Sequence, residues 1–169
     1  VKDVLVIFLK EAKKENMLKY FLLASLVALS DQFTKMLVIK NIAEEQSIRV
    51  NTYFDFVHIK NPGAAFDFLS DAGGWQRYFL STVAAVASVY LIFMIKQYKN
   101  DFYTALALSL ILGGALGNLY DRISLGYVTD FIFFHFSIFD YYWPVFNVAD
   151  TAITVGAVIL FYELVTTKE

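Results

Sequence analysis

The chain has 169 residues, of which 58% are apolar and 18% are charged, and its mean hydropathy is +0.54. Soluble domains carry about 25% charged residues, so this balance is typical of a membrane protein, and the net charge of −2 argues against a nucleic-acid partner, which requires a basic face. The absence of cysteine excludes disulfides, thiol nucleophiles and cysteine metal sites, and the two histidines are too few for a histidine-rich centre, so no metal or cofactor is expected.

Four apolar segments dominate the chain. A short apolar run at residues 4–9 precedes them, but it is too short to span a bilayer, so residues 1–16 are predicted to be an interfacial or disordered segment. A bilayer core of about 30 Å requires roughly 20 mainly apolar residues in a helix. The segments that meet this requirement lie at about 17–38, 78–95, 102–119 and 148–165. Because no repeat or linker divides them, residues 17–169 are predicted to form one all-α membrane domain, a four-helix bundle.

The connection between the first two predicted helices, about residues 40–77, is long and patterned. Ser47–Asn51 and Tyr53–Lys60 alternate and are rich in Val, Ile, Phe and Tyr, which predicts two short strands. Asn61-Pro62-Gly63 follows them as a turn signal. We therefore expect a small β-sheet in this loop, resting on the membrane surface. The loop before the last helix, about residues 120–146, is dense in aromatic residues, which are typical of the headgroup level.

The distribution of positive charge predicts the orientation, because cytoplasmic loops carry an excess of lysine and arginine. The N-terminal flank, the short connection between the second and third helices and the C-terminal tail contain Lys2, Lys10, Lys13, Lys14, Lys19, Lys96, Lys99 and Lys168. The two long loops contain Lys40, Arg49, Lys60, Arg77 and Arg122. Both termini are therefore predicted to be cytoplasmic, and both long loops to face outward.

Polar residues within apolar segments are costly, so they mark pathways, sites or structural pairs. Asp31 and Lys35 are i,i+4 neighbours in the first helix and can neutralise each other. We interpret them as an ion pair that fixes this helix to the bundle, with a direct catalytic role as the alternative.

The third helix carries a second polar group. Gly113 and Gly117 form a GxxxG pattern, which allows helices to approach closely. Gly114, Asn118 and Arg122 follow at every fourth position, which places an amide and a guanidinium above a groove floored by glycine. Two roles remain open for Arg122: its side chain can snorkel to the interface, or it can hold a substrate carbonyl or a lipid phosphate.

Asp130 and Asp150 are carboxylates in apolar surroundings on either side of the second long loop. Capping of the fourth helix is an alternative explanation for Asp150 but not for Asp130. Two carboxylates held close together in a low-dielectric site titrate as a pair, so that one is protonated while the other is charged. Such a pair suits peptide hydrolysis, with one member as general base and the other as general acid. The spacing alone does not show that the two residues meet.

Two other functions are compatible with these carboxylates. A proton-coupled carrier uses buried carboxylates as relays, and a small membrane scaffold uses them as structural pairs. A chain with four helices and no visible inverted repeat is less typical of a carrier. Within hydrolases, the sequence contains no G-x-S-x-G elbow and no H-E-x-x-H motif.

Five motifs resemble the lipoprotein signal peptidase family, also called signal peptidase II, of bacterial aspartic endopeptidases. These motifs are Ser30–Lys35, Asn61–Phe66, Gly113–Arg122, Gly126–Ile132 and Phe146–Ile153. They follow the family's order and cover about residues 17–165. Lys60 departs from the pattern, since members often have arginine there, and this puts a bidentate substrate contact at that position in doubt.

The resemblance implies roles for individual residues. Asp130 and Asp150 match the catalytic pair. Asp31 and Lys35 match a structural polar pair. The residues that match site-lining groups, which position the substrate or the aspartates, are Asn61, Asn118, Asp121, Arg122 and Asn147.

The resemblance also implies a substrate and a location. The expected substrates are prolipoproteins whose lipobox cysteine carries diacylglycerol, cut just before that cysteine, and globomycin-type cyclic peptides are the expected inhibitors. The expected location is the bacterial inner membrane, in contact with its lipids, with the active site at the periplasmic face. We expect a monomer. The aromatic density around Phe66 and Trp143 further predicts a clamp on the lipid and the peptide.

Overall fold

The computed structural model describes residues 17–63, 73–135 and 143–166. Within them lie four helices long and apolar enough to cross a membrane, α2 (Leu18–Asn41), α3 (Trp75–Gln97), α4 (Phe102–Ser124) and α5 (Val148–Thr166). The prediction of four spans is confirmed. The predicted N-terminal segment, residues 1–16, lies outside the described residues.

α4 ends at Ser124 rather than near residue 119, so the third predicted span was too short. The prediction followed apolar composition, whereas the helix continues through a polar end that includes Asn118 and Asp121. Both of these side chains are buried, with exposed fractions of 6% and 1%, because partners from other elements satisfy them. These two polar side chains are therefore part of the packed interior.

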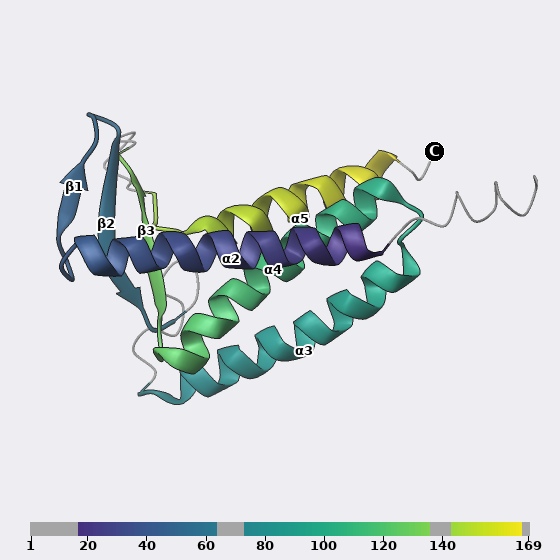
Figure 1. Cartoon of the computed structure of the whole chain (residues 1–169), viewed down its shortest axis with the longest axis horizontal. Helices are drawn as coiled ribbons and strands as arrows, with labels where there is room; N and C mark the ends of the chain where they lie inside the picture. The colour runs from purple at the N-terminus through teal and green to yellow at the C-terminus, as the bar shows by residue number, and fades with distance from the viewer. Residues whose placement is uncertain (1–16, 64–72, 136–142, 167–169) are drawn as a thin grey trace, which may run out of the picture.

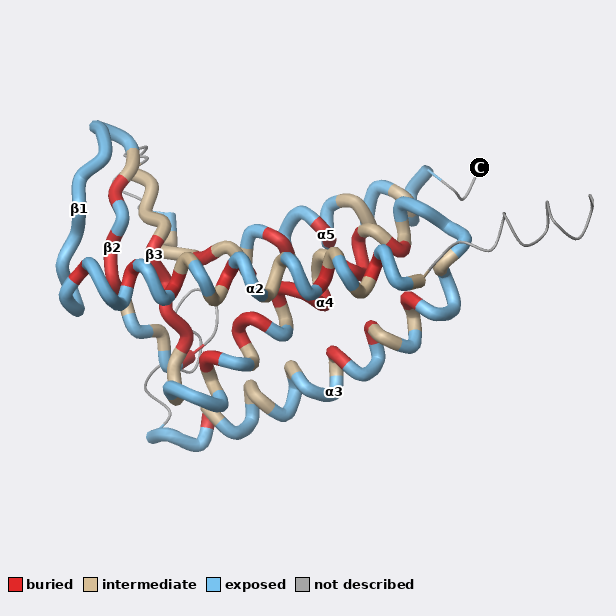
Figure 2. The backbone as a smooth tube through the Cα atoms, in the orientation of Figure 1, coloured by how far each residue is buried: buried red, intermediate tan, exposed pale blue. Residues whose placement is uncertain are grey.

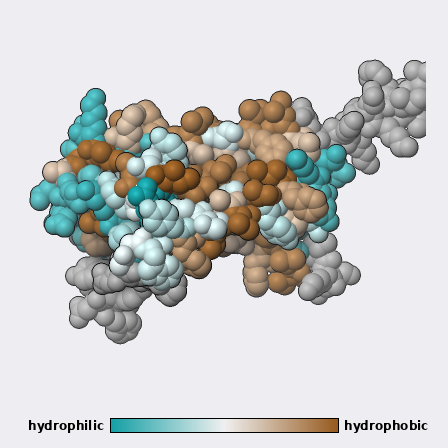
Figure 3. Space-filling view, turned by 90° about the horizontal axis from the view of Figure 1, so that it is seen from below, coloured by the Kyte–Doolittle hydropathy of each residue, from teal (hydrophilic) through white to brown (hydrophobic). Residues whose placement is uncertain are grey.

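α4 is the central helix of the bundle. It packs against α2, α3 and α5, and the sheet lies across one end of the four helices (Figure 1). Figure 2 shows buried residues gathered along α4, whereas α3 and α5 are mostly exposed or half-buried. Figure 3 shows apolar surface over the body of the helices and more hydrophilic surface at the sheet end. An apolar outer surface on a helical bundle is what contact with lipid requires, and the protein is a multi-pass membrane protein.

Glycines set the helix spacing. A Cβ on Gly113 would lie 2.6 Å from the Ala24 carbonyl oxygen of α2, and one on Gly114 would lie 2.7 Å from Ile153 Cγ1 of α5. A Cβ on Gly117 would lie 2.6 Å from Asp31 Oδ2. These contacts confirm that the GxxxG pattern brings helices close together. Gly114 is closed against α5, however, so the prediction that it floors a groove was wrong.

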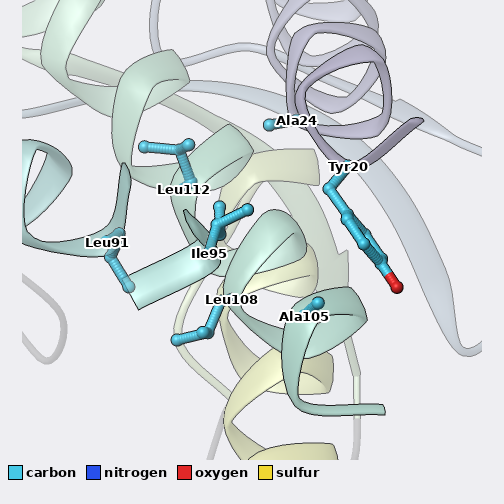
Figure 4. Packing of buried hydrophobic residues seen from close by; sticks show 7 residues of the cluster. All are labelled: Tyr20, Ala24, Leu91, Ile95, Ala105, Leu108 and Leu112. Carbon is cyan, nitrogen blue, oxygen red and sulfur yellow. The ribbon is translucent and has the colours of Figure 1, made fainter. Parts of the chain in front are cut away.

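The inner part of the bundle, away from the sheet, is held by apolar packing among α2, α3 and α4. Figure 4 shows this cluster, formed by Tyr20, Ala24, Leu91, Ile95, Ala105, Leu108 and Leu112. A second small cluster joins the C-terminal end of α2 to the sheet through Val38, Ile42 and Phe131. The two clusters hold the bundle at both ends, and the polar site lies between α2, α4, α5 and the sheet.

The sheet contains β1 (Ser47–Arg49), β2 (Phe54–Asn61) and β3 (Val128–Phe134) in the antiparallel order β1-β2-β3. The two strands predicted in the first long loop are confirmed. β3 was not predicted, because its aromatic residues were assigned only to the membrane interface. It pairs with β2 so that Ile59 lies opposite Asp130, and strand pairing between such distant segments cannot be seen in local composition.

Arg77 joins the N-terminal end of α3 to the C-terminal end of α4. Its Nε donates to the Arg122 carbonyl at 2.8 Å, and its Nη2 donates to the Ile123 carbonyl at 2.7 Å. A cation is favourable at a helix C-terminus, where carbonyls lack partners. Gly126 follows with a φ of 92°, a conformation that favours glycine, and leads the chain into β3. Arg77 therefore helps to fix the point where α4 passes to the sheet.

Candidate active site

Asp130 and Asp150 line one groove at the sheet end of the bundle. The groove has a volume of about 870 Å³. Its polar lining comes from β2, β3, α4 and α5, and consists of Lys60, Asn61, Asn118, Arg122, Asp130, Asp150, Thr151 and Thr154. Its apolar lining includes Phe133, Trp143, Ile153 and Val155. The structure thus brings together two carboxylates that the sequence placed only on either side of a loop.

Asp130 is held by β3 and is 3% exposed. Asn61, the last residue of β2, donates its Nδ2 to Asp130 Oδ2 at 2.9 Å. Asn147 donates its Nδ2 to Asp130 Oδ1 at 2.6 Å. Both carboxylate oxygens therefore have an amide donor, and their directions are set by the register of β3 against β2.

Asp150 lies in the first turn of α5. Its Oδ1 accepts from Asn118 Nδ2 at 2.8 Å, and its Oδ2 accepts from the Asn147 backbone N–H at 3.2 Å. The Asp150 backbone N–H in turn donates to Asn147 Oδ1 at 2.9 Å. This reciprocal pair resembles a capping box. The capping interpretation of Asp150 is therefore correct for one oxygen, while the other contacts a groove residue.

Asn147 links the two carboxylates. Its side chain donates to Asp130 and its backbone donates to Asp150, and the residue is fully buried. A single buried residue that hydrogen-bonds both carboxylates fixes their relative position. Such an arrangement suits a reaction in which one reacting atom contacts both groups.

The pKa of Asp130 is far from that of an ordinary carboxyl. Burial, and after it the negative charge of Asp150, raise the pKa of Asp130 from 3.8 to about 7. Hydrogen bonds from Asn61 and Asn147, together with the charge of Lys35, act in the opposite direction. Asp130 therefore retains its proton in a substantial fraction of molecules at neutral pH, which is the state that a general acid requires.

Asp31, Lys35 and Asp121 form a buried ion network behind the groove. Lys35 Nζ lies 2.8 Å from Asp31 Oδ2 and 3.0 Å from Asp121 Oδ2. Asp31 Oδ1 also accepts the Ala149 backbone N–H of α5 at 2.9 Å. Asp31 and Lys35 thus connect α2 to α4 and α5, and neither lines the groove.

Asp121 lies behind the groove rather than on its wall. Its Oδ2 accepts the Thr129 backbone N–H at 3.0 Å, and its Oδ1 accepts Gln32 Nε2 at 2.9 Å. It therefore positions the start of β3. Gln32 was not assigned a role from the sequence, although it lies within the Ser30–Lys35 motif. Its amide also donates to the Gly117 carbonyl at 3.0 Å.

The Arg122 side chain hydrogen-bonds the protein backbone rather than extending to solvent. Its Nη2 donates to the Gly63 carbonyl at 3.0 Å, which joins α4 to the Asn61–Gly63 turn, and the side chain lines the groove. Its Nε is buried and has no hydrogen-bond partner among the described residues. This geometry argues against snorkelling, and the substrate-holding role stays a prediction.

Lys60 lines the groove beside Asn61, and its Nζ forms an ion pair with Glu44 and lies 5.1 Å from the centre of the Tyr127 ring. Of the two residues predicted to form a clamp, Trp143 lines the groove, whereas Phe66 lies outside the described residues. Within the described ranges, no group of three or more His, Asp or Glu side chains is placed to hold a metal ion.

Comparisons with known proteins agree on one family. The family model described as signal peptidase (SPase) II matches residues 23–166. A lipoprotein signal peptidase of Teredinibacter turnerae is 49% identical over 147 residues, covering 86% of each chain. A lipoprotein signal peptidase of Alteromonas mediterranea is 42% identical over 152 residues, covering 89% of this chain and 82% of the relative.

Two solved structures, each described as a bacterial membrane enzyme, share the fold. One has a TM-score of 0.80 at 28% sequence identity and covers 89% of this chain and 90% of its own. The other has a TM-score of 0.74 at 29% identity and covers 86% of this chain and 92% of its own.

Proposed function

The chain belongs to the signal peptidase II family, and on this premise we propose that it cleaves prolipoproteins with Asp130 and Asp150 as an aspartic catalytic pair. As a member of this family, it removes signal peptides from prolipoproteins. The observation that supports the aspartic mechanism is the position of Asn147, which hydrogen-bonds both carboxylates within one groove.

The proposed reaction uses one proton shared by the pair. Charged Asp150 accepts a proton from water, and the water oxygen attacks the scissile carbonyl carbon. Protonated Asp130 donates its proton to the carbonyl oxygen, which forms a neutral gem-diol. As the carbon–nitrogen bond breaks, Asp150 transfers its proton to the leaving amine and the gem-diol returns a proton to Asp130. The pair ends with one proton, as it began.

The groove suits a bond held at the membrane surface. Ile153 and Val155 of α5 continue its wall away from the sheet, along a helix that spans the membrane, while Asn61 and Lys60 lie at the sheet end. We propose that the diacylglyceryl chains of the modified cysteine follow the apolar wall, and that Trp143 covers them. The bond just before that cysteine then lies beside Asp130 and Asp150.

We also propose that the sheet and the groove face the periplasm from the bacterial inner membrane. The C-terminal ends of α2 and α4 and the first turns of α3 and α5 lie at the sheet end (Figure 1). Lys96, in the last turn of α3, and Lys99, between α3 and α4, lie at the opposite end. Because positive charge favours the cytoplasmic side, this arrangement supports a cytoplasmic location for both termini.

Lipid modification of the substrate is expected to decide turnover. Purified protein in detergent is incubated with one preprolipoprotein in two forms, with and without diacylglycerol on its lipobox cysteine, and the released signal peptide is quantified. We expect cleavage of the lipidated form only, with kcat/KM at least about 100-fold higher, since an acyl chain buries many CH₂ groups at about 0.8 kcal/mol each. Equal cleavage of both forms would contradict the proposed substrate.

Cleavage is expected to decline as pH rises above about 7. The pKa of Asp130 is raised to about 7, so the protonated form exists below this pH and is lost above it. Because the mechanism needs that proton, kcat/KM should fall about tenfold for each further pH unit. The raised pKa also makes ionisation destabilising, so fold stability should fall as pH rises from about 4 to about 7. A pH profile that stays level to about pH 9 would exclude Asp130 as the acid.

A further inference from the structure

Lys35 is a buried cation that the reaction above does not use. Its side chain is 2% exposed. Its Nζ contacts Asp31 Oδ2 at 2.8 Å, Asp121 Oδ2 at 3.0 Å and Asn118 Oδ1 at 2.9 Å. An ammonium has three N–H donors and no acceptor, so these contacts use its full capacity. The side chain is therefore held in a single geometry.

The contact with Asn118 exceeds what a structural ion pair needs. Asp31 and Asp121 already offset the charge of Lys35, yet its third donor is directed at an amide. A lysine cannot accept a hydrogen bond, so the amide must present its oxygen to Lys35 and its nitrogen to the other side. On that side lies Asp150, whose Oδ1 accepts Asn118 Nδ2 at 2.8 Å. Lys35 at 2.9 Å, together with the more distant Asn147 Nδ2 at 3.3 Å, thus fixes which way the Asn118 amide faces.

The same lysine acts on the pair through its charge. The charged groups that face Asp130 and Asp150 are Asp31 and Lys35 of α2, Asp121 and Arg122 of α4, and Lys60 on the groove wall. The charge of Lys35 lowers the pKa of Asp130, against the stronger effects of burial and of Asp150. If this charge were removed, the half-buried Arg122 would remain as a cation on the groove wall.

We propose that Lys35 is a positioning residue for hydrolysis, which acts through Asn118 to hold Asp150. The proposal rests on the function proposed above for Asp130 and Asp150. It extends the role of Lys35 from a helix-joining ion pair to the control of catalytic geometry.

The test compares Asp31→Asn with the double variant Lys35→Met, Asp31→Asn. Removing Asp31 together with Lys35 leaves the net charge of the buried cluster unchanged, because Asp121 stays charged, so the double variant is less destabilised than Lys35→Met alone. Asp31→Asn damages the ion pair but leaves the Lys35 contact with Asn118. Lys40→Met, an exposed site in the same helix, is the matched control. Thermal unfolding, kcat, KM and the pH profile are measured for each protein in detergent with lipidated substrate.

We expect the double variant to have a kcat about 100-fold below that of Asp31→Asn with a similar KM, because Asp150 is no longer held in place. The descending limb of its pH profile should lie about one unit above that of Asp31→Asn, since the two variants differ by the positive charge of Lys35. Asp31→Asn should lose stability without this upward shift, and Lys40→Met should match the unaltered protein. If the double variant shows the kcat and pH profile of Asp31→Asn, Lys35 is structural only.

A second variant tests the proposal if the double variant does not fold. Lys35→Arg keeps the charge, but its planar fork cannot direct three donors as an ammonium does. We expect the pH profile to stay in place and kcat to fall about tenfold, and an unchanged kcat would overturn the proposal. Cleavage by Asp130→Asn or Asp150→Asn would instead refute the catalytic pair itself, so the two failures are distinguishable.

Discussion

Asp130→Asn and Asp150→Asn are each expected to lower kcat on a lipidated prolipoprotein at least about 10³-fold, because an amide can act neither as general base nor as general acid. Asparagine has the shape of aspartate, and each carboxylate has partners that an amide oxygen can still accept from, such as Asn61 for Asp130 and Asn118 for Asp150. Folding should therefore be retained. Release of signal peptide and the thermal unfolding transition in detergent are the measurements.

Asp55→Asn is the matched control for this experiment. Asp55 is a buried carboxylate on β2, 8% exposed, and its Oδ2 lies 2.8 Å from Nε2 of His135, the residue after β3. It does not line the groove. We expect Asp55→Asn to retain most of the activity of the unaltered protein. Its activity should still decline above about pH 7. Substantial cleavage by either Asp130→Asn or Asp150→Asn, or loss of cleavage in all three variants, would argue against the pair.

Gly114→Val is expected to lower both stability and activity. The first atom of the new side chain would lie 2.7 Å from Ile153 Cγ1 and still closer to the Ala149 carbonyl of α5, so α4 and α5 must separate. Overpacking of this kind costs about 3 kcal/mol. Separation would also move Asn118 of α4 away from Asp150 of α5, which are joined by a 2.8 Å hydrogen bond. Thermal unfolding and kcat in detergent measure the two effects.

Ala85→Val provides the control for Gly114→Val. Ala85 is exposed on α3, where an added side chain meets no neighbouring helix, so stability should change by less than about 0.5 kcal/mol. If Gly114→Val unfolds at the same temperature as Ala85→Val, the close contact between α4 and α5 does not exist in the membrane protein.

The choice among peptidase, carrier and scaffold was decided by the family, not by the carboxylates alone. Buried aspartates in a bundle are compatible with all three functions. Membership of the signal peptidase II family selects the peptidase. The assignment of Asp130 and Asp150 as the catalytic pair remains a proposal, supported by the groove they share and by Asn147.

Single residues show where local pattern was sufficient and where it was not. Asp31 and Lys35, four positions apart on one helix, were expected to form an ion pair, and they do so because helix geometry alone brings them together. The contact of Lys35 with Asn118 was not expected, since it joins residues 83 positions apart, in α2 and α4. Gln32 was overlooked for the same reason, as its partner Asp121 lies on α4.

The sequence by itself determined the four spans, the two strands of the first loop and the membrane class, because hydropathy and alternation are properties of neighbouring residues. Tertiary structure alone decided that Asp130 and Asp150 share a groove. The pairing of β3 with β2 sets the position of Asp130. The close contact of α4 with α5 at Gly114 brings Asn118 within hydrogen-bond distance of Asp150. Both are contacts between distant segments, and no local pattern of residues specifies them.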